Sequence, residues 1–300
     1  MMRGLKRIAV IGGDERQIYL ASALARMGWQ VAAYGLGNCE ERLCPAAAVE
    51  TLSACVAEAS AIVLPMPASV DGVRVSCPLA PDTAPRFTTV LENRNGALVI
   101  GGKLPPVLST LTQETEQIDL IDDEVLQLKN ALPTAEGAIS IAMRELPVTI
   151  DGIHAAVIGY GRIGEILADK LYALGANVYV YARRKEALTR AALRHAHPMQ
   201  MVNRDGTSTL GQIPRNCRVI FNTVPHQIFT REVVETLPRA CVYIDLASAP
   251  GGIDWSAAGE LGIRAVWGSG LPGKCVPETA GILLAETVDE ILRAKGVDLC

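Results

Sequence analysis

A glycine-rich turn in the second half of the chain has the spacing of a phosphate-binding loop. The segment 157–164 reads Val-Ile-Gly-Tyr-Gly-Arg-Ile-Gly, which is G-x-G-x-x-G after an apolar run. We expect Gly159 to allow the tight turn, Gly161 to let the backbone approach a pyrophosphate, and Gly164 to let the next helix pack close to the strand. The phosphates would lie at the N-terminus of that helix, where free N–H groups favour an anion.

The residues around this turn supply the context that a dinucleotide-binding motif requires. The sequence predicts a strand over 153–158, a helix over 165–174 and a second strand over 177–181. Arg183 and Arg184 follow the second strand, where an NAD site usually has an acidic residue for the ribose 2′-hydroxyl. Two cations suit a 2′-phosphate, so we expect NADP as cofactor, with NAD as the alternative. The competing interpretation is two solvated arginines.

Short polar loops end other strands expected in this half and add further candidates. His226 is the one histidine on such a loop and is a weak candidate for moving a proton. Asp245, a second weak candidate, is either a site residue or a structural hydrogen-bond acceptor, so the catalytic base stays unassigned. The cofactor-binding candidates are Gly159, Gly161, Arg162, Ile163, Gly164, Arg183, Arg184, Thr223, Pro225 and Ala247.

The chain contains a related pattern twice. The run Ala-Val-Ile-Gly at 9–12 returns at 156–159, and Gly28 and Gly175 stand at corresponding helix ends. Both halves therefore begin with the same β-α-β unit. We expect an α/β protein with two Rossmann-like, doubly wound parallel-sheet domains and a cleft between them.

The first copy of the turn lacks the glycine that would approach a phosphate. Asp14 stands where the second copy has Gly161, and Arg16 follows it. Because a pyrophosphate fits poorly beside a carboxylate, we expect the first half to be a substrate domain, with Arg16 and Lys103 as cations for an acidic ligand. The alternative is that Asp14 caps its helix and that both cations are solvated.

A helix start and a glycine-rich loop are the other expected anion sites. A short helix is expected over 122–130, after which Thr134 is expected to cap a separate crossover helix, and the loop 270–273 brings backbone N–H groups near a carboxylate. The expected segments are a substrate domain (1–132), a crossover helix (133–150), an NADP-binding domain (151–275) and a C-terminal helix (276–300) packing back at the domain interface. The substrate-binding candidates are Arg16, Lys103, Thr134, Glu136, Gly137, Gly270, Leu271, Pro272 and Gly273.

Composition argues against several other classes of protein. The 300 residues carry a net charge of −4, which gives no electrostatic signature of nucleic-acid binding. No apolar run approaches the length of a membrane span, and no signal peptide is recognisable at the N-terminus. The eight cysteines lack any C-x-x-C pair, and none of the four histidines has a metal-site spacing with them. We expect a cytoplasmic homo-oligomer with reduced thiols and no metal.

Several longer motifs resemble one family from almost end to end. The chain resembles the A subunit of dipicolinate synthase from spore-forming bacteria, most specifically in the last two of the runs given below. The motifs are Val-Ile-Gly-Gly-Asp-Glu-Arg-Gln (10–17), Val-Ile-Gly-Tyr-Gly-Arg-Ile-Gly (157–164), Leu-Pro-Thr-Ala-Glu-Gly (132–137), Asn-Thr-Val-Pro (222–225), Asp-Leu-Ala-Ser-Ala-Pro-Gly-Gly (245–252) and Gly-Leu-Pro-Gly (270–273).

The resemblance implies an activity that the spacing of residues does not. The family oxidises a dihydrodipicolinate-type ring to pyridine-2,6-dicarboxylate with a nicotinamide cofactor, and it works with the B subunit of dipicolinate synthase. The resemblance also implies that the substrate is a small dicarboxylate and that the protein is located in the mother-cell cytoplasm of a sporulating bacterium. His226 matches no family motif.

Two other functions stay open at this point. A 2-hydroxyacid or alanine dehydrogenase shares the two-domain plan, but a 2-hydroxyacid enzyme needs a histidine late in the chain, and none follows His226. A non-enzymatic NADP-sensing protein would keep the cofactor motif without turnover. Reduction of NADP⁺ by a dihydrodipicolinate pool separates these alternatives.

Overall fold

The chain forms two compact units, each built on one parallel sheet. The computed structural model describes residues 7–92, 96–111, 116–203 and 205–297. One unit contains the chain up to Asn130 together with the segment from Val276, and the other runs from Ala131 to Cys275. No helix among the described residues is long and apolar enough to cross a membrane.

The first unit is a six-stranded sheet in the order β3-β2-β1-β4-β5-β6, with every neighbouring pair parallel. Its strands are β1 (Arg7–Ile11), β2 (Gln30–Tyr34), β3 (Ala47–Ala48), β4 (Ala59–Val63), β5 (Leu98–Gly101) and β6 (Gln117–Asp119). Its helices are α1 (Glu15–Arg26), α2 (Glu40–Leu43), α3 (Leu52–Val56), α4 (Phe87–Glu92), α5 (Pro106–Leu111) and α12 (Pro277–Ala294).

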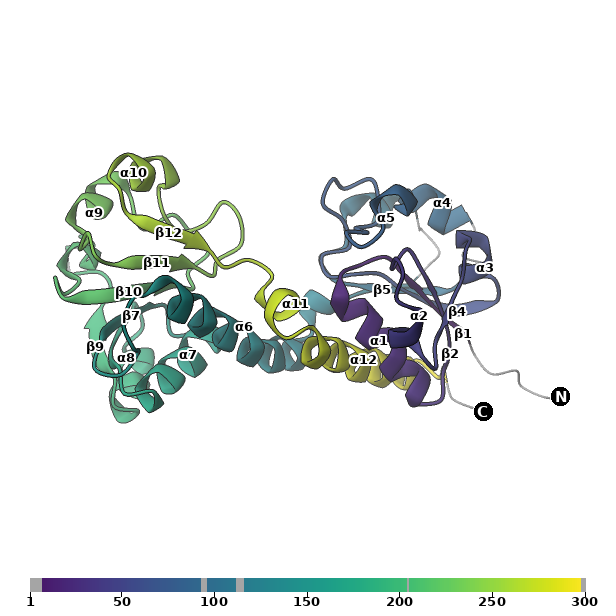
Figure 1. Ribbon diagram of the computed structural model, residues 1–300, viewed down its shortest axis with the longest axis horizontal. Helices are drawn as coiled ribbons and strands as arrows, with labels where there is room; N and C mark the ends of the chain where they lie inside the picture. Colours follow the sequence, from purple (N-terminus) through teal and green to yellow (C-terminus); the bar gives the residue numbers. More distant parts are fainter. Residues whose placement is uncertain (1–6, 93–95, 112–115, 204, 298–300) are drawn as a thin grey trace. The chain divides into compact units, whose positions relative to one another are not determined.

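Helix α12 belongs to this first unit and packs against α1 (Figure 1). Gly281 permits the close approach, because a Cβ there would lie 2.5 Å from the carbonyl oxygen of Arg16 and 2.7 Å from Cβ of Tyr19. Apolar residues of α12, among them Leu284 and Val288, join the same core as Leu20 and Leu24 of α1. The C-terminal helix predicted within 276–300 therefore occurs, as Pro277–Ala294.

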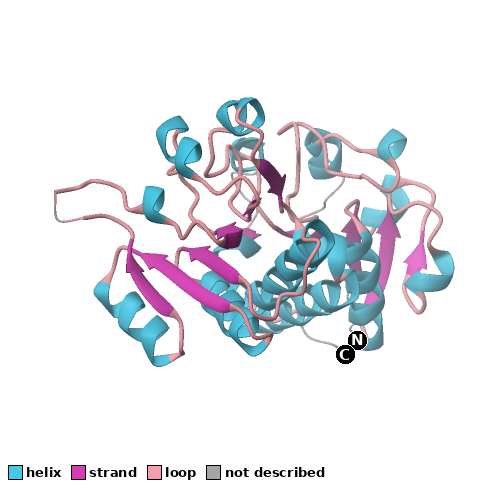
Figure 2. Cartoon of the chain, turned by 60° about the vertical axis from the view of Figure 1, so that its left-hand side comes forward, coloured by secondary structure: helices cyan, strands magenta, loops and turns pink. Residues whose placement is uncertain are grey.

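The second unit repeats the arrangement, with the strand order β12-β11-β10-β7-β8-β9 and parallel pairing throughout. Its strands are β7 (His154–Ile158), β8 (Asn177–Ala182), β9 (His197–Gln200), β10 (Cys217–Asn222), β11 (Val242–Asp245) and β12 (Arg264–Trp267). Its helices are α7 (Arg162–Ala173), α8 (Lys185–Leu193), α9 (Arg231–Thr236), α10 (Trp255–Glu260) and α11 (Leu271–Cys275). Figure 2 shows helices running alongside the strands of each sheet.

The internal repeat is visible in the hydrogen bonds of the two units. The Gly12 N–H donates to the Tyr34 carbonyl at 2.8 Å, and the Gly159 N–H donates to the Tyr181 carbonyl at 2.9 Å. Each first strand is thus joined at its carboxyl end to the end of the second strand. The expectation of two Rossmann-like sheets is confirmed.

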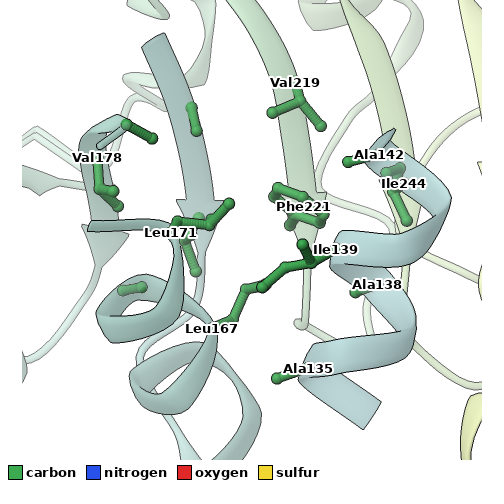
Figure 3. Close-up of a cluster of buried hydrophobic side chains, with 14 of the residues drawn as sticks. Ala135, Ala138, Ile139, Ala142, Leu167, Leu171, Val178, Val219, Phe221 and Ile244 are labelled. Carbon is green, nitrogen blue, oxygen red and sulfur yellow. The ribbon is translucent and has the colours of Figure 1, made fainter. Parts of the chain in front are cut away.

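Helix α6 (Glu124–Glu145) corrects the predicted helix boundaries. Two helices were expected on either side of Pro133, but one continuous helix contains this proline. In the second unit, Ala135, Ala138 and Ala142 are fully buried on the sheet beside Phe221 and Ile244 (Figure 3). Packing of this small-residue face outweighs the loss of one backbone hydrogen bond at proline.

Candidate functional site

Two glycines of the turn in the second unit, Gly159 and Gly164, leave no room for a side chain. Gly159 has φ +93°, and a Cβ there would lie 2.4 Å from Oγ1 of Thr223. A Cβ at Gly164 would lie 2.2 Å from the Gly159 carbonyl oxygen, so α7 packs directly on the end of β7. Both positions have the steric reason for glycine that the motif predicted.

Gly161 differs from these two glycines because open space surrounds it. It is the N-cap of α7, with φ −97°, and no heavy atom lies within 4 Å of a Cβ built there. Arg162 and Ile163 form the first turn of the helix, which contains twelve residues. A helix N-terminus with room in front of it is the expected seat of a pyrophosphate.

A pocket of about 370 Å³ lies beside this turn, within the second unit. Arg183 and Arg184 follow β8 and are exposed, and no salt bridge among the described residues involves either of them. The pocket thus combines a phosphate turn with two cations. Its lining is Gly159, Tyr160, Ala182, Arg183, Arg184, Ala187, Met201 and Val224.

Five lining residues were not predicted from the sequence. Ala182, Ala187, Met201 and Val224 are small or apolar and are indistinguishable from core residues without the fold. Tyr160 stands between the motif glycines, which is a signal that was available. Its ring lies 5.9 Å from the Arg190 guanidinium carbon, and burial raises the pKa of its hydroxyl.

His226 lies in a second pocket of about 280 Å³ that shares Arg183, Met201 and Val224 with the first. The histidine is exposed, and no hydrogen bond to its ring is found among the described residues. The loop that carries His226 therefore lies next to Arg183, at the edge of the first pocket. A role for His226 as a base stays a prediction.

Asp245 is fully buried and holds two strand-end loops together. Its carboxylate accepts from Asn222 Nδ2 at 3.0 Å, from the Ala247 N–H at 3.0 Å and from the Gly252 N–H at 2.6 Å. This geometry supports the structural alternative of the two that the sequence left open. Thr223 is anchored separately, because its hydroxyl donates to the Ile158 carbonyl at 2.9 Å.

The equivalent turn of the first unit is filled by the protein's own atoms. A Cβ at Gly12 would lie 2.5 Å from Sγ of Cys77, and one at Gly13 would lie 2.1 Å from Cγ of Gln17. Asp14 caps α1 by accepting from the Arg16 N–H at 3.1 Å. This turn has no room for a dinucleotide pyrophosphate beside its glycines.

The two first-unit cations have different surroundings. Arg16 is not solvated: its side chain is 12% exposed, it forms an ion pair with Asp14, and it donates to the Met66 carbonyl at 2.5 Å. Lys103 is exposed and has φ +52°. Its backbone N–H donates to Asp119 Oδ1 at 2.8 Å. The expectation of a solvated Arg16 is therefore wrong, whereas that of a solvated Lys103 agrees with its exposure.

The expected anion site at Thr134 is also corrected. Thr134, Glu136 and Gly137 are interior residues of α6, where the backbone N–H groups are used by the helix. Glu136 instead pairs with Lys170 at 2.9 Å.

The glycine-rich loop at 270–273 is shorter than expected, because α11 begins at Leu271 and includes Pro272 and Gly273. Gly270, with φ +65°, precedes this helix. The structure brings two substrate candidates together, since a Cβ at Gly137 would lie 2.9 Å from Cβ of Leu271.

Comparison with known proteins identifies the family. The first unit matches the model of the N-terminal domain of the dipicolinate synthase A subunit over residues 7–122, and residues 154–249 match the NAD-binding domain of 6-phosphogluconate dehydrogenase. The A subunit of dipicolinate synthase from Bacillus subtilis (strain 168) is 30% identical over 295 residues, covering 97% of each chain.

Solved structures agree with these sequence matches. The crystal structure of the dipicolinate synthase A subunit from Bacillus halodurans has a TM-score of 0.85 and 29% identity, covering 96% of this chain and 97% of that one. An L-alanine dehydrogenase shares the fold at 13% identity, with a TM-score of 0.67 and coverage of 97% and 91%. With a nucleotide-binding second unit and a relative of this identity along nearly its whole length, the chain belongs to the A-subunit family of dipicolinate synthase.

Proposed function

We propose that the protein is an NADP-dependent oxidoreductase that converts a dihydrodipicolinate-type ring to pyridine-2,6-dicarboxylate. The observation that carries the cofactor assignment is the pocket lined both by Gly159 and Tyr160 of the glycine-rich turn and by Arg183 and Arg184, which form no salt bridge among the described residues. Family membership supports the substrate class.

Different residues of the second unit bind different parts of the cofactor. The N–H groups at the start of α7 bind the pyrophosphate, and Arg183 and Arg184 bind the ribose 2′-phosphate. His226, beside Arg183, then lies at the adenosine end of the cofactor. Thr223, Pro225 and Ala247 flank the nicotinamide ribose on the loops after β10 and β11.

The oxidation removes one hydride and one proton from the dihydropyridine ring and leaves an aromatic dicarboxylate. A bound nicotinamide cofactor supplies the hydride acceptor, and the proton passes to a base or to water. The first unit binds the dicarboxylate through Arg16 and Lys103. We also propose the B subunit of dipicolinate synthase as partner, a homo-oligomeric state and the mother-cell cytoplasm of a sporulating bacterium.

The test is reduction of NADP⁺ with a freshly generated dihydrodipicolinate pool, measured with and without the B subunit, together with direct detection of pyridine-2,6-dicarboxylate. Equal amounts of NADPH and product support the proposal. Tight NADP binding without turnover under both conditions would instead support a non-enzymatic NADP sensor. Turnover of a 2-hydroxyacid or of alanine in place of the ring would reassign the substrate.

A further inference from the structure

One buried amide in the first unit has a hydrogen-bond donor with no partner. Gln17 is 2% exposed, and its Nε2 atom makes no hydrogen bond in the structure. An unsatisfied buried donor destabilises a fold, and such groups are rare in native proteins. The amide of Gln17 therefore calls for a functional explanation.

The amide lies where an α/β sheet binds its ligands. In the order β3-β2-β1-β4-β5-β6, β1 and β4 are the neighbours at which the strand order reverses, and ligands bind outside the carboxyl ends of such strands. Gln17 is in the first turn of α1, directly after β1. Its Cγ packs over Gly13, and the same point on Gly13 faces Cβ of Pro65, which follows β4.

The charged residues beside the Gln17 amide, Asp14 and Arg16, neutralise each other. The carboxylate of Asp14 is fully engaged, because Arg16 donates to it from Nε and Nη2 at 2.9 Å each. Arg16 Nη2 also donates to the carbonyl of Met66, which lies three residues after Val63, the last residue of β4. The pair cancels the charge of Asp14, and no hydrogen bond from Arg16 Nη1 is found among the described residues. An anionic group is therefore not repelled here.

We propose that the Gln17 carboxamide donates a hydrogen bond to one carboxylate of the substrate at the carboxyl ends of β1 and β4, with Arg16 beside it. This inference rests on the proposed function, because that function supplies the dicarboxylate. It assigns substrate binding to a residue outside the predicted set. It also explains why a buried amide without a protein partner is retained.

The experiment compares Gln17→Met with Gln30→Met. Methionine keeps the length of the side chain and removes the donor. Gln30 is exposed at the opposite, amino end of β2, so the control makes the same chemical change in the same unit. The probe is pyridine-2,6-dicarboxylate, titrated calorimetrically into the full-length protein without cofactor, with NADP titrated separately.

We expect Gln17→Met to bind the dicarboxylate at least about tenfold more weakly, with unchanged NADP affinity and a thermal midpoint no lower than that of the wild type. Wild-type dicarboxylate affinity in this variant would overturn the inference and leave the proposed function intact. If the wild type binds no dicarboxylate at all, the proposed function fails as well. Should Gln17→Met not fold, Gln17→Asn withdraws the amide by one methylene and is expected to show the same selective loss.

Discussion

Arg16 donates from Nε and Nη2 to both carboxylate oxygens of Asp14, at 2.9 Å for each bond. The pair occupies the turn that, in the second unit, holds the open Gly161. The β-α turn of the first unit is thus filled by its own side chains and carries an ion pair, whereas the equivalent turn of the second unit is open and lies beside Arg183 and Arg184. The two units differ at the residues of this turn, while the hydrogen bonds that join their first and second strands are alike.

Replacing Arg16 by alanine is therefore expected to do more than weaken substrate binding. It removes the two side-chain donors from the Asp14 carboxylate, which keeps only the Arg16 backbone N–H, and it removes the side-chain donor from the Met66 carbonyl. We expect a loss of about 1–3 kcal/mol in the free energy of unfolding. We also expect a raised KM. Urea denaturation and steady-state kinetics measure the two effects, and a variant with wild-type stability would show that the ion pair is not maintained in solution.

The arginines after β8 are expected to set cofactor preference. Replacing Arg183 and Arg184 together by alanine removes charge-assisted bonds to the 2′-phosphate, each typically worth about 1.5–3 kcal/mol or roughly ten- to a hundredfold in affinity, so the double variant should bind NADP at least about a hundredfold more weakly. NAD affinity should change little. The matched control removes Arg231 and Arg239 from the same unit. Equal affinity of the wild type for NAD and NADP would refute the assignment.

Two glycines of the same motif should fail in different ways. Gly161→Val is expected to fold normally, since nothing lies within 4 Å of its Cβ, and to lose cofactor binding. Gly164→Ala places a Cβ 2.2 Å from a carbonyl oxygen and should lower the unfolding midpoint. Circular dichroism and NADP titration distinguish the two outcomes. A folded Gly161→Val protein that binds NADP like the wild type would place the phosphates elsewhere.

Asp245 is expected to be needed for stability. Asp245→Ala leaves the buried N–H groups of Ala247 and Gly252 and the Asn222 amide without their acceptor, and we expect a loss of about 3–5 kcal/mol in the free energy of unfolding. Urea denaturation checks this. A stable variant with abolished turnover and normal cofactor binding would instead make Asp245 a catalytic residue.

The Cys55 thiol should contribute to alkaline sensitivity. Burial raises its pKa from 9.0 to about 12, so above pH 9 the unfolded thiol ionises while the folded one stays protonated. The unfolded state then binds fewer protons, and stability falls as pH rises from 9 towards 12, by at most about 1.4 kcal/mol per pH unit for this group. Cys55→Ala should show a shallower decline in urea titrations over that range. An unchanged slope would mean that the thiol ionises in the folded protein.

Much of the fold was predictable because its signals are local. Apolar runs such as 155–158 and 242–245 end in glycine or polar residues, and the strands predicted over 153–158 and 177–181 occur as β7 and β8. Strand β3 has no such signal, because its two residues, Ala47 and Ala48, are exposed and carry no pattern. The continuous α6 was missed because proline disfavours a helix interior, and only the packing of distant strands outweighs that preference.

The candidate site was predictable where backbone geometry dictates the residue type. Gly159 and Gly164 are required by steric contacts that the motif encodes. The hydrogen bonds of Arg16 and the burial of Gln17 could not be predicted from the sequence. They depend on the positions of Met66 and Pro65, about fifty residues further along the chain. Whether the Gln17 amide has a hydrogen-bond partner is decided by the fold and cannot be predicted from the neighbouring sequence.

Because α12 completes the first unit, that unit is built from two stretches of chain separated by the whole of the second. During synthesis on a ribosome, which releases the N-terminal part first, the α1 face that Gly281 and Leu284 cover stays bare until the last helix has emerged. The second unit, from Ala131 to Cys275, is continuous and is available to fold earlier. The nucleotide-binding unit can therefore complete its fold before the first unit, although part of the first unit is synthesised earlier.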